Sequence, residues 1–191
     1  MASAQWYAVW LKSISNGMNE IDAIQRANRV NGIERKELVR CRIMTGKGES
    51  LLLSMAVEGG SRKLREINKE QGLSLSAHGN WRKNHLGALE ALYGKTPFYE
   101  HIMSGLFPVF KNQDLTALSS FNSGIHKVLS EFLLGDFYFN EKNNPFSENV
   151  VLMERGKEIA KRINPKISII DSLMHLGRES LPALFQLNLS V

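Results

Sequence analysis

Cysteine is nearly missing from this chain of 191 residues, which has Cys41 alone. A single cysteine excludes an intramolecular disulfide framework and any cysteine-rich zinc or iron–sulfur site, and it is typical of a reducing compartment. The apolar stretches, of which residues 51–57 are an example, are far shorter than the roughly 20 residues of a membrane-spanning helix. The first residues also lack the basic start of a secretory signal. We therefore expect a cytoplasmic protein with no membrane insertion.

Several catalytic and cofactor-binding motifs are missing as well. The chain has no Gly-x-Ser-x-Gly turn for a serine nucleophile and no His-Glu-x-x-His or His-x-x-His spacing for a metal. Gly46-Lys47-Gly48 lacks the longer glycine pattern and the strand-to-helix context of a nucleotide-binding loop. The sequence therefore predicts no metal site and no bound cofactor.

Length and composition are those of one ordinary domain. Apolar residues make up 43% and charged residues 23%, close to the average of soluble globular proteins. The length favours a single domain over residues 1–191. Strand patterns concentrate in residues 1–79 and helix patterns in residues 80–191, so we predict an α+β fold.

Positive charge belongs to the first half of the chain. Residues 1–95 carry 15 basic and 9 acidic groups, whereas residues 96–191 carry 9 and 10. Such an excess attracts an anionic small molecule, such as a nucleotide sugar, or an anionic partner, although solvated strand and loop surfaces are the simpler explanation. Nucleic acid ranks behind both, because aromatic residues are not interleaved with the basic cluster.

The clearest local structure is a β-hairpin. Residues 38–44 and 50–57 are β-prone and flank a glycine-containing connection. Alternation places Val39, Cys41 and Ile43 on the buried face, and Arg40 and Arg42 together on the other face. Two guanidinium groups on one face suit a phosphate or carboxylate, although a solvent-facing strand has the same pattern. Cys41 is then inert packing.

Periodicity and turn signals predict the remaining elements. In the first half we expect a helix over 4–15, a strand over 20–26, a turn at Asn31-Gly32, and short strands over 64–67 and 73–76. In the second half we expect a loop over 140–149 and helices over 81–93, 96–107 with Thr96 as its cap, 115–134 capped by Asp114, 150–163, 167–176 and 179–187.

His85 is the first candidate for chemistry. It lies four residues after Trp81, so the two side chains emerge on one apolar helix face. An imidazole in such surroundings serves as a neutral general base, and a hydrogen-bonded core histidine gives the same pattern. Asp171 is an isolated acid that either orients an imidazole or caps a helix.

The chain resembles a known family at several places. The segment from Asn80 to Glu100, NWRKNHLGALEALYGKTPFYE, is similar to the central Trp, His, Ala-Tyr and Thr-Pro-Phe-Phe pattern of the WbqC-like proteins. Further similarities follow in order at residues 40–43, residues 53–60, Phe121-Asn122 and residues 169–175. The family is associated with bacterial surface-polysaccharide clusters, and the resemblance implies a glycine or aminoacyl transferase role.

Two hypotheses of different classes follow. In the first, a transferase acts on an activated amino sugar or amino acid, with His85 and Asp171 as catalytic residues. Its substrate-binding residues are Arg40, Arg42, Trp81, Tyr93, Thr96 and Asn122.

In the second hypothesis the chain is a noncatalytic binding protein whose basic half recognises an anionic ligand or partner. The polar stretch over residues 34–40, in which only Arg40 matches the family, favours this second hypothesis.

Overall fold

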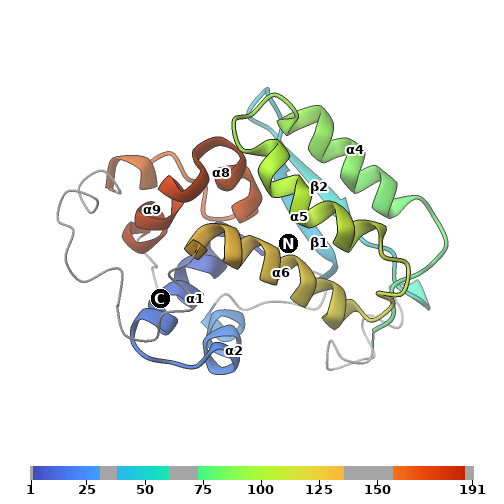
Figure 1. Cartoon of the computed structure of the whole chain (residues 1–191), viewed down its shortest axis with the longest axis horizontal. Coiled ribbons are helices and arrows are strands. Elements are labelled where there is room, and N and C mark those ends of the chain that lie inside the picture. Colours follow the sequence, from blue (N-terminus) through green and yellow to red (C-terminus); the bar gives the residue numbers. More distant parts are fainter. Residues whose placement is uncertain (1, 31–37, 61–72, 136–156, 188–191) are drawn as a thin grey trace.

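Helices from the two ends of the chain lie side by side, and a short antiparallel hairpin lies beside helices of the middle of the chain (Figure 1). Their buried side chains form one hydrophobic core. The computed structural model describes residues 2–30, 38–60, 73–135 and 157–187. The elements, in chain order, are α1 (Ala4–Ser15), α2 (Glu20–Val30), β1 (Arg40–Met44), β2 (Ser50–Ser54), α4 (Trp81–Tyr93), α5 (Tyr99–Lys111), α6 (Leu118–Leu134), α8 (Ile169–Leu176), the 3-10 turn η4 (Gly177–Glu179) and α9 (Ser180–Gln186). The fold is α+β, as the sequence predicts.

The hairpin has the predicted alternation. Cys41 pairs with Leu53 and Arg42 with Leu52 in an antiparallel register. Cys41 and Ile43 are buried, whereas Arg42 is exposed and Arg40 is half-buried. The connection closes through Thr45, whose backbone N–H donates to Glu49 O at 2.8 Å. The period-2 pattern thus places the buried face of β1 on the helices.

The predicted strand over residues 20–26 is wrong, because this segment is helix α2. Asn19 begins the helix by accepting a hydrogen bond from the Asp22 N–H at 3.0 Å. Ala23 and Ala27, four residues apart, are fully buried and form the contact face. Two alanines make a weak apolar stripe, which a search for larger hydrophobic residues misses.

Two helices begin later than predicted. Thr96 does not cap α5; its hydroxyl donates to Tyr93 O at 2.7 Å, and α5 starts at Tyr99. Asp114 does not cap α6, which starts at Leu118. The residues before Leu118 are extended, because the Leu75 N–H donates to Thr116 O and the Leu118 N–H donates to Leu73 O. Pairing with residues 73–75 therefore replaces the first helical turn.

Proline and glycine act differently at two helix ends. Pro108 does not end α5, which continues to Lys111. The proline is exposed, and it removes one hydrogen bond to the carbonyl four residues earlier. Gly135 ends α6 as predicted, with a φ of 56° that favours glycine.

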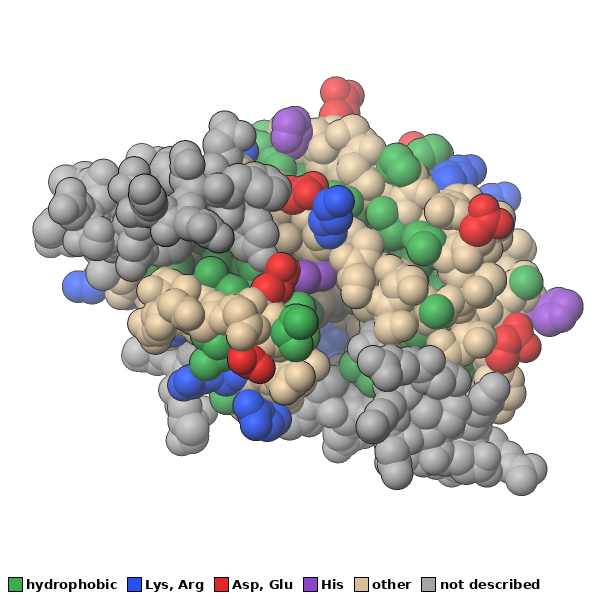
Figure 2. All heavy atoms as spheres, turned by 60° about the horizontal axis from the view of Figure 1, so that its bottom comes forward, with side chains coloured by type: hydrophobic (Ala, Val, Ile, Leu, Met, Phe, Trp, Pro, Cys, Tyr) green, Lys and Arg blue, Asp and Glu red, His purple; other side chains and the backbone are tan. Residues whose placement is uncertain are grey.

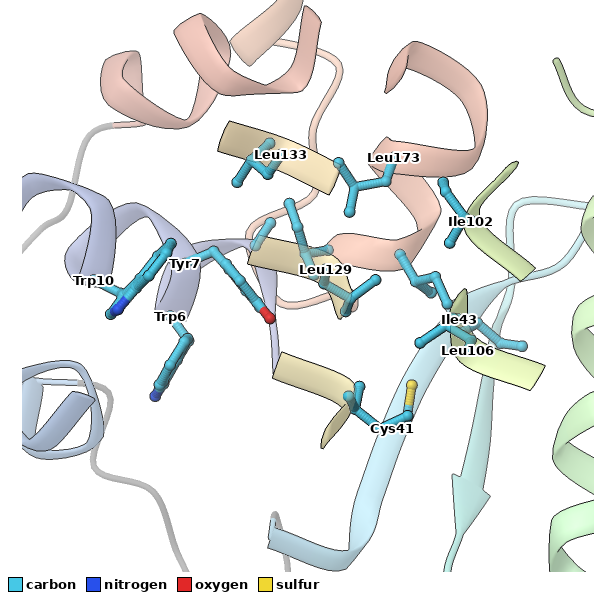
Figure 3. Close-up of a cluster of buried hydrophobic side chains, with 14 of the residues drawn as sticks. Trp6, Tyr7, Trp10, Cys41, Ile43, Ile102, Leu106, Leu129, Leu133 and Leu173 are labelled. Atoms are coloured by element: carbon cyan, nitrogen blue, oxygen red, sulfur yellow. The ribbon is translucent and has the colours of Figure 1, made fainter. Parts of the chain in front are cut away.

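α6 runs through the middle of the core. Its buried residues Leu129 and Leu133 face Leu173 of α8 and residues of α5 and β1 (Figure 3). The terminal segments join the same core. The Ala4 N–H donates to Ile167 O at 2.8 Å, and the Ser168 N–H donates to Arg42 O at 2.8 Å. The start of α1, the approach to α8 and strand β1 are therefore held together.

Four predictions concern residues outside those that the structure describes. They are the turn at Asn31-Gly32, the strand over 64–67, the loop over 140–149 and most of the helix over 150–163.

His126 of α6 joins α1 and α2. The Tyr7 hydroxyl lies 3.1 Å from His126 Nδ1, and Glu20 of α2 lies 3.5 Å from Nε2. The rings of Trp6 and Trp10 contact the imidazole edge-on, with centroids 5.4 and 4.8 Å away. Burial lowers the pKa of His126, while Glu20 opposes that shift. This cluster is where α2 gains polar contacts that its alanines do not supply.

We predict that Asn28→Ala loosens α2 more than the rest of the fold. Asn28 Oδ1 accepts a hydrogen bond from Trp6 Nε1 at 2.7 Å, so its removal leaves a buried indole N–H unpaired, at a cost of about 1–3 kcal/mol. Hydrogen exchange should accelerate in residues 20–30. Gln25→Ala, on the exposed side of the same helix, is the control and should leave exchange unchanged. Equal exchange in both variants would contradict the role of this bond.

Candidate functional site

Helix α4 has two faces with different surroundings. Trp81, His85, Leu89 and Tyr93, spaced by four residues, form its buried face. The opposite face is polar and includes Lys83, Gly87 and Glu90, all exposed. The Asn80 side chain makes no capping hydrogen bond, although the helix starts where predicted. The three predicted site residues of α4, Trp81, His85 and Tyr93, therefore all lie on its buried face.

The polar face of α4 lines a groove of about 880 Å³. Lys83, Asn84, Gly87 and Glu90 lie on its α4 side, while Phe107, Lys111 and Gln113 lie on its α5 side. Residues of the loop before α4 and Trp81 also line the groove. Of the predicted site residues, only Trp81 borders this groove.

Arg82 holds the two sides of the groove together. Its guanidinium donates to Val109 O, Phe110 O and Leu115 O at 3.3, 3.0 and 2.8 Å. It also lies over the Trp81 ring, 4.7 Å from the centroid. Burial lowers the pKa of Arg82. No sequence pattern indicates a role for this residue, because its partners are backbone carbonyls 27 to 33 residues later.

His85 lies behind Trp81, away from the groove. Its side chain is 3% exposed, and its ring contacts Trp81 at 5.6 Å and Phe110 at 6.0 Å. Nδ1 lies 2.7 Å from Trp81 O; a carbonyl only accepts, so Nδ1 carries the proton. Burial lowers the pKa of His85 to about 4. The imidazole is therefore neutral at pH 7.

His85 and Arg40 share a second, much smaller cavity. It measures about 10 Å³ and is also lined by Cys41, Met55 and Phe121. That volume is at the lower limit for one water molecule. Burial raises the pKa of the Cys41 thiol. The cavity brings two predicted site residues together but has no room for a sugar or an amino acid.

Tyr93 and Asp171 form a separate pair at the other end of α4. The Tyr93 hydroxyl donates to Asp171 Oδ1 at 2.7 Å and accepts from the Met44 N–H at 3.3 Å. Burial, then the bond to Asp171, raises the pKa of Tyr93. Tyr93 lies eight residues beyond His85, about 12 Å along the helix axis. Asp171 is therefore placed to orient the phenol and not the imidazole of His85.

Of the remaining predicted site residues, Thr96 contacts the Tyr93 group, whereas Arg42 and Asn122 belong to neither group. Arg42 is exposed on the hairpin. The Asn122 amide donates to Leu38 O at 3.2 Å, which links α6 to the segment before β1. Thr96 is bonded to Tyr93 O, as described above. The structure thus gathers the candidates into two buried groups and an exposed hairpin, not into one open site.

The described residues form neither a metal-binding cluster nor a membrane-spanning helix. No three side chains of histidine, cysteine, aspartate or glutamate in this part of the chain are grouped to hold a metal ion. Within the described ranges, every helix is too short or too polar to cross a membrane.

Figure 2 shows the face formed by α2 and its surroundings, and there the coloured basic and acidic side chains are interspersed. Among the described residues on this face, the positive charge does not gather into one patch.

Comparison with known proteins assigns the family. The sequence model of the WbqC-like protein family matches residues 16–144, about two thirds of the chain. The chain belongs to the WbqC-like protein family. The matched part contains the groove of this WbqC-like protein, the hairpin and both cavity-lining residues His85 and Arg40. No curated protein and no solved structure shows significant similarity to the chain.

We predict that His85 makes the fold sensitive to acid. Its folded-state pKa of about 4 lies below the ordinary value of 6.5, so the unfolded chain binds more protons between these values and stability rises with pH. The contribution is complete above pH 6.5 and is lost as the pH falls toward 4. The contribution of His85 to the free energy of unfolding, measured with denaturant, should be about 2 kcal/mol smaller at pH 5 than at pH 8.

The matched variants for this prediction are His85→Gln and His78→Gln. The first should lose that part of the pH dependence, whereas the second changes an exposed histidine and should keep it. An unchanged pH profile in His85→Gln would show that the imidazole is not held neutral by burial.

We also predict that Tyr93→Phe destabilises the protein by about 1–3 kcal/mol, because it leaves the Met44 N–H and the Asp171 carboxylate without their shared partner. The measurement is the free energy of unfolding in urea. Tyr99→Phe, which removes a half-buried hydroxyl on the next helix, is the comparison and should cost less. Equal losses would argue against the Tyr93 network.

Proposed function

We propose that this WbqC-like protein is a binding protein for an anionic small molecule, such as a nucleotide sugar, in bacterial surface-polysaccharide assembly. The observation that carries the proposal is the groove of about 880 Å³ between α4 and α5. Ligand sites commonly measure about 300–1,000 Å³. The groove lies within the part of the chain that matches the family.

The charge of the groove supports an anionic ligand. Lys83 and Lys111 line it, and Arg82 adds positive charge, although its donors are engaged with carbonyls. Glu90 is the acidic side chain among the lining residues. Lysines attract phosphate as mobile point charges. Trp81, a predicted substrate-binding residue, forms part of the wall.

The transferase hypothesis receives less support from the same geometry. His85 would have to receive a substrate in a cavity of about 10 Å³, and the Trp81 ring packs against the imidazole. A base with a pKa near 4 is also poorly matched to proton removal at pH 7. Asp171 is engaged with Tyr93 at a distance from His85. We therefore propose the noncatalytic hypothesis ahead of aminoacyl transfer.

The test is thermal stabilisation by UDP-glucose. A ligand at 100 times its dissociation constant adds about 2.7 kcal/mol to the stability of the native state. The melting temperature of a chain of this length should then rise by about 5–10 °C. Lys83→Ala combined with Lys111→Ala should weaken binding at least tenfold.

Lys95→Ala is the matched control, because Lys95 is exposed between the same two helices but does not line the groove. Binding that is unaffected by the double substitution, or reduced equally by Lys95→Ala, would place the ligand elsewhere. Absence of stabilisation by any phosphate-bearing ligand would overturn the proposal.

A further inference from the structure

Gly87 is a glycine in the middle of α4 with no packing role in the described structure. It is exposed and lines the groove. A Cβ atom placed on it meets no other part of the described chain within 4 Å. By contrast, the Cβ of Gly105 in α5 would lie 2.7 Å from Val128, so that glycine permits close helix packing. Glycine within a helix is unfavourable compared with alanine, and a common reason for one is close approach of another molecule to the backbone.

Phe107 lies on the other side of the same groove. Phe107 is 48% exposed, so its ring is open to a ligand in the groove. The ammonium group of Lys111, one turn later on α5, lies 5.1 Å from the centre of the ring. The ring thus offers one flat face beside a positive charge.

The packing of the two helices places these features next to one another. Arg82 near the start of α4 bonds to the carbonyls of residues 109 and 110 near the end of α5, and a short connection joins the helices, so they run antiparallel. Moving one turn along α4, from Lys83 to Gly87, therefore corresponds to moving one turn back along α5, from Lys111 to Phe107. The groove thus has a basic part at Lys83 and Lys111 and a second part at Gly87 and Phe107. The two parts lie about one helical turn, 5–6 Å, apart.

We infer that the groove binds a ring joined to a phosphate, with the ring between Phe107 and the bare backbone at Gly87 and the phosphate between Lys83 and Lys111. This inference rests on the proposed function and specifies which residues of the groove hold the ring and which hold the phosphate. A sugar or a nucleobase presents a flat face that stacks on an aromatic side chain. A side chain at position 87 would occupy the space that such a ring needs.

The decisive variants are Gly87→Ala and Gly87→Leu. Both add a good helix former where there is room, so the melting temperature should stay the same or rise. Calorimetric titration uses three probes: inorganic pyrophosphate, UDP and glucose 1-phosphate. In the unchanged protein, UDP or glucose 1-phosphate should bind at least tenfold more tightly than pyrophosphate. Gly87→Leu should remove that advantage and leave pyrophosphate binding within twofold.

Two controls distinguish a specific loss of ring binding from a general loss of affinity. Ala88→Leu enlarges the neighbouring residue, which does not line the groove, and should leave all three affinities unchanged. Phe107→Ala should weaken the ring-bearing probe at least fivefold, whereas Leu52→Ala, at an exposed leucine of the hairpin, should not.

The outcomes distinguish the proposed anion-binding groove from the inferred ring site within it. If pyrophosphate binds but neither ring-bearing probe binds more tightly, the ring site is overturned and the anion-binding groove remains. The same holds if Gly87→Leu keeps the tighter binding. If none of the probes binds, both fail. Preference for UDP assigns the ring to the nucleoside, and preference for glucose 1-phosphate assigns it to the sugar.

Discussion

The guanidinium of Arg82 is the contact on which the arrangement of α4, α5 and α6 depends. Three carbonyls receive its hydrogen bonds, two from the last turn of α5 and one from the extended segment before α6. Carbonyls at a helix end lack intrahelical partners, so a charged donor fork is well suited to them. Since Arg82 itself lies on α4, the bonds also set the separation of the two sides of the groove. Arg82 thus joins α4 to α5 and to the segment before α6 by hydrogen bonds, which the apolar side chains of the buried face cannot make.

The burial of His85 illustrates why the residue type does not determine chemistry. The same Trp-x-x-x-His spacing serves a base in an open site or a packed ring in a core. Here the ring is enclosed by Trp81, Phe110 and the small cavity, and its proton is held by a backbone carbonyl. Desolvation then keeps it neutral far below physiological pH. The residues of α4 that a ligand in the groove can reach are instead Lys83, Asn84 and Gly87.

Elements with strong local signals were predictable, and the relations between them were not. The hairpin, α4 and the end of α6 carry alternation, periodicity and glycine signals that the structure confirms. The prediction for α2 is wrong, because its apolar stripe consists of two alanines. These alanines are identified as a buried face only once α1 is packed against them. The start of α6 was displaced by pairing with residues 73–75, a contact between segments some forty residues apart.

The sequence also identified Trp81 as a candidate for ligand contact, but neither Gly87, Phe107 nor Arg82. Arg82 and Gly87 lie on α4 and Phe107 lies on α5, so these residues are brought together by the packing of the two helices, which no local pattern indicates.

The family match and the folding unit have different boundaries. The match covers residues 16–144, yet the Ala4 N–H donates to Ile167 O and the Ser168 N–H donates to Arg42 O, so segments on both sides of the match are bonded to each other and to strand β1. α1 and α8 also supply fully buried side chains, Trp10 and Leu173 among them. A fragment trimmed to the matched residues would expose these surfaces to water. The hydrophobic core of this chain therefore extends beyond the portion that matches the family.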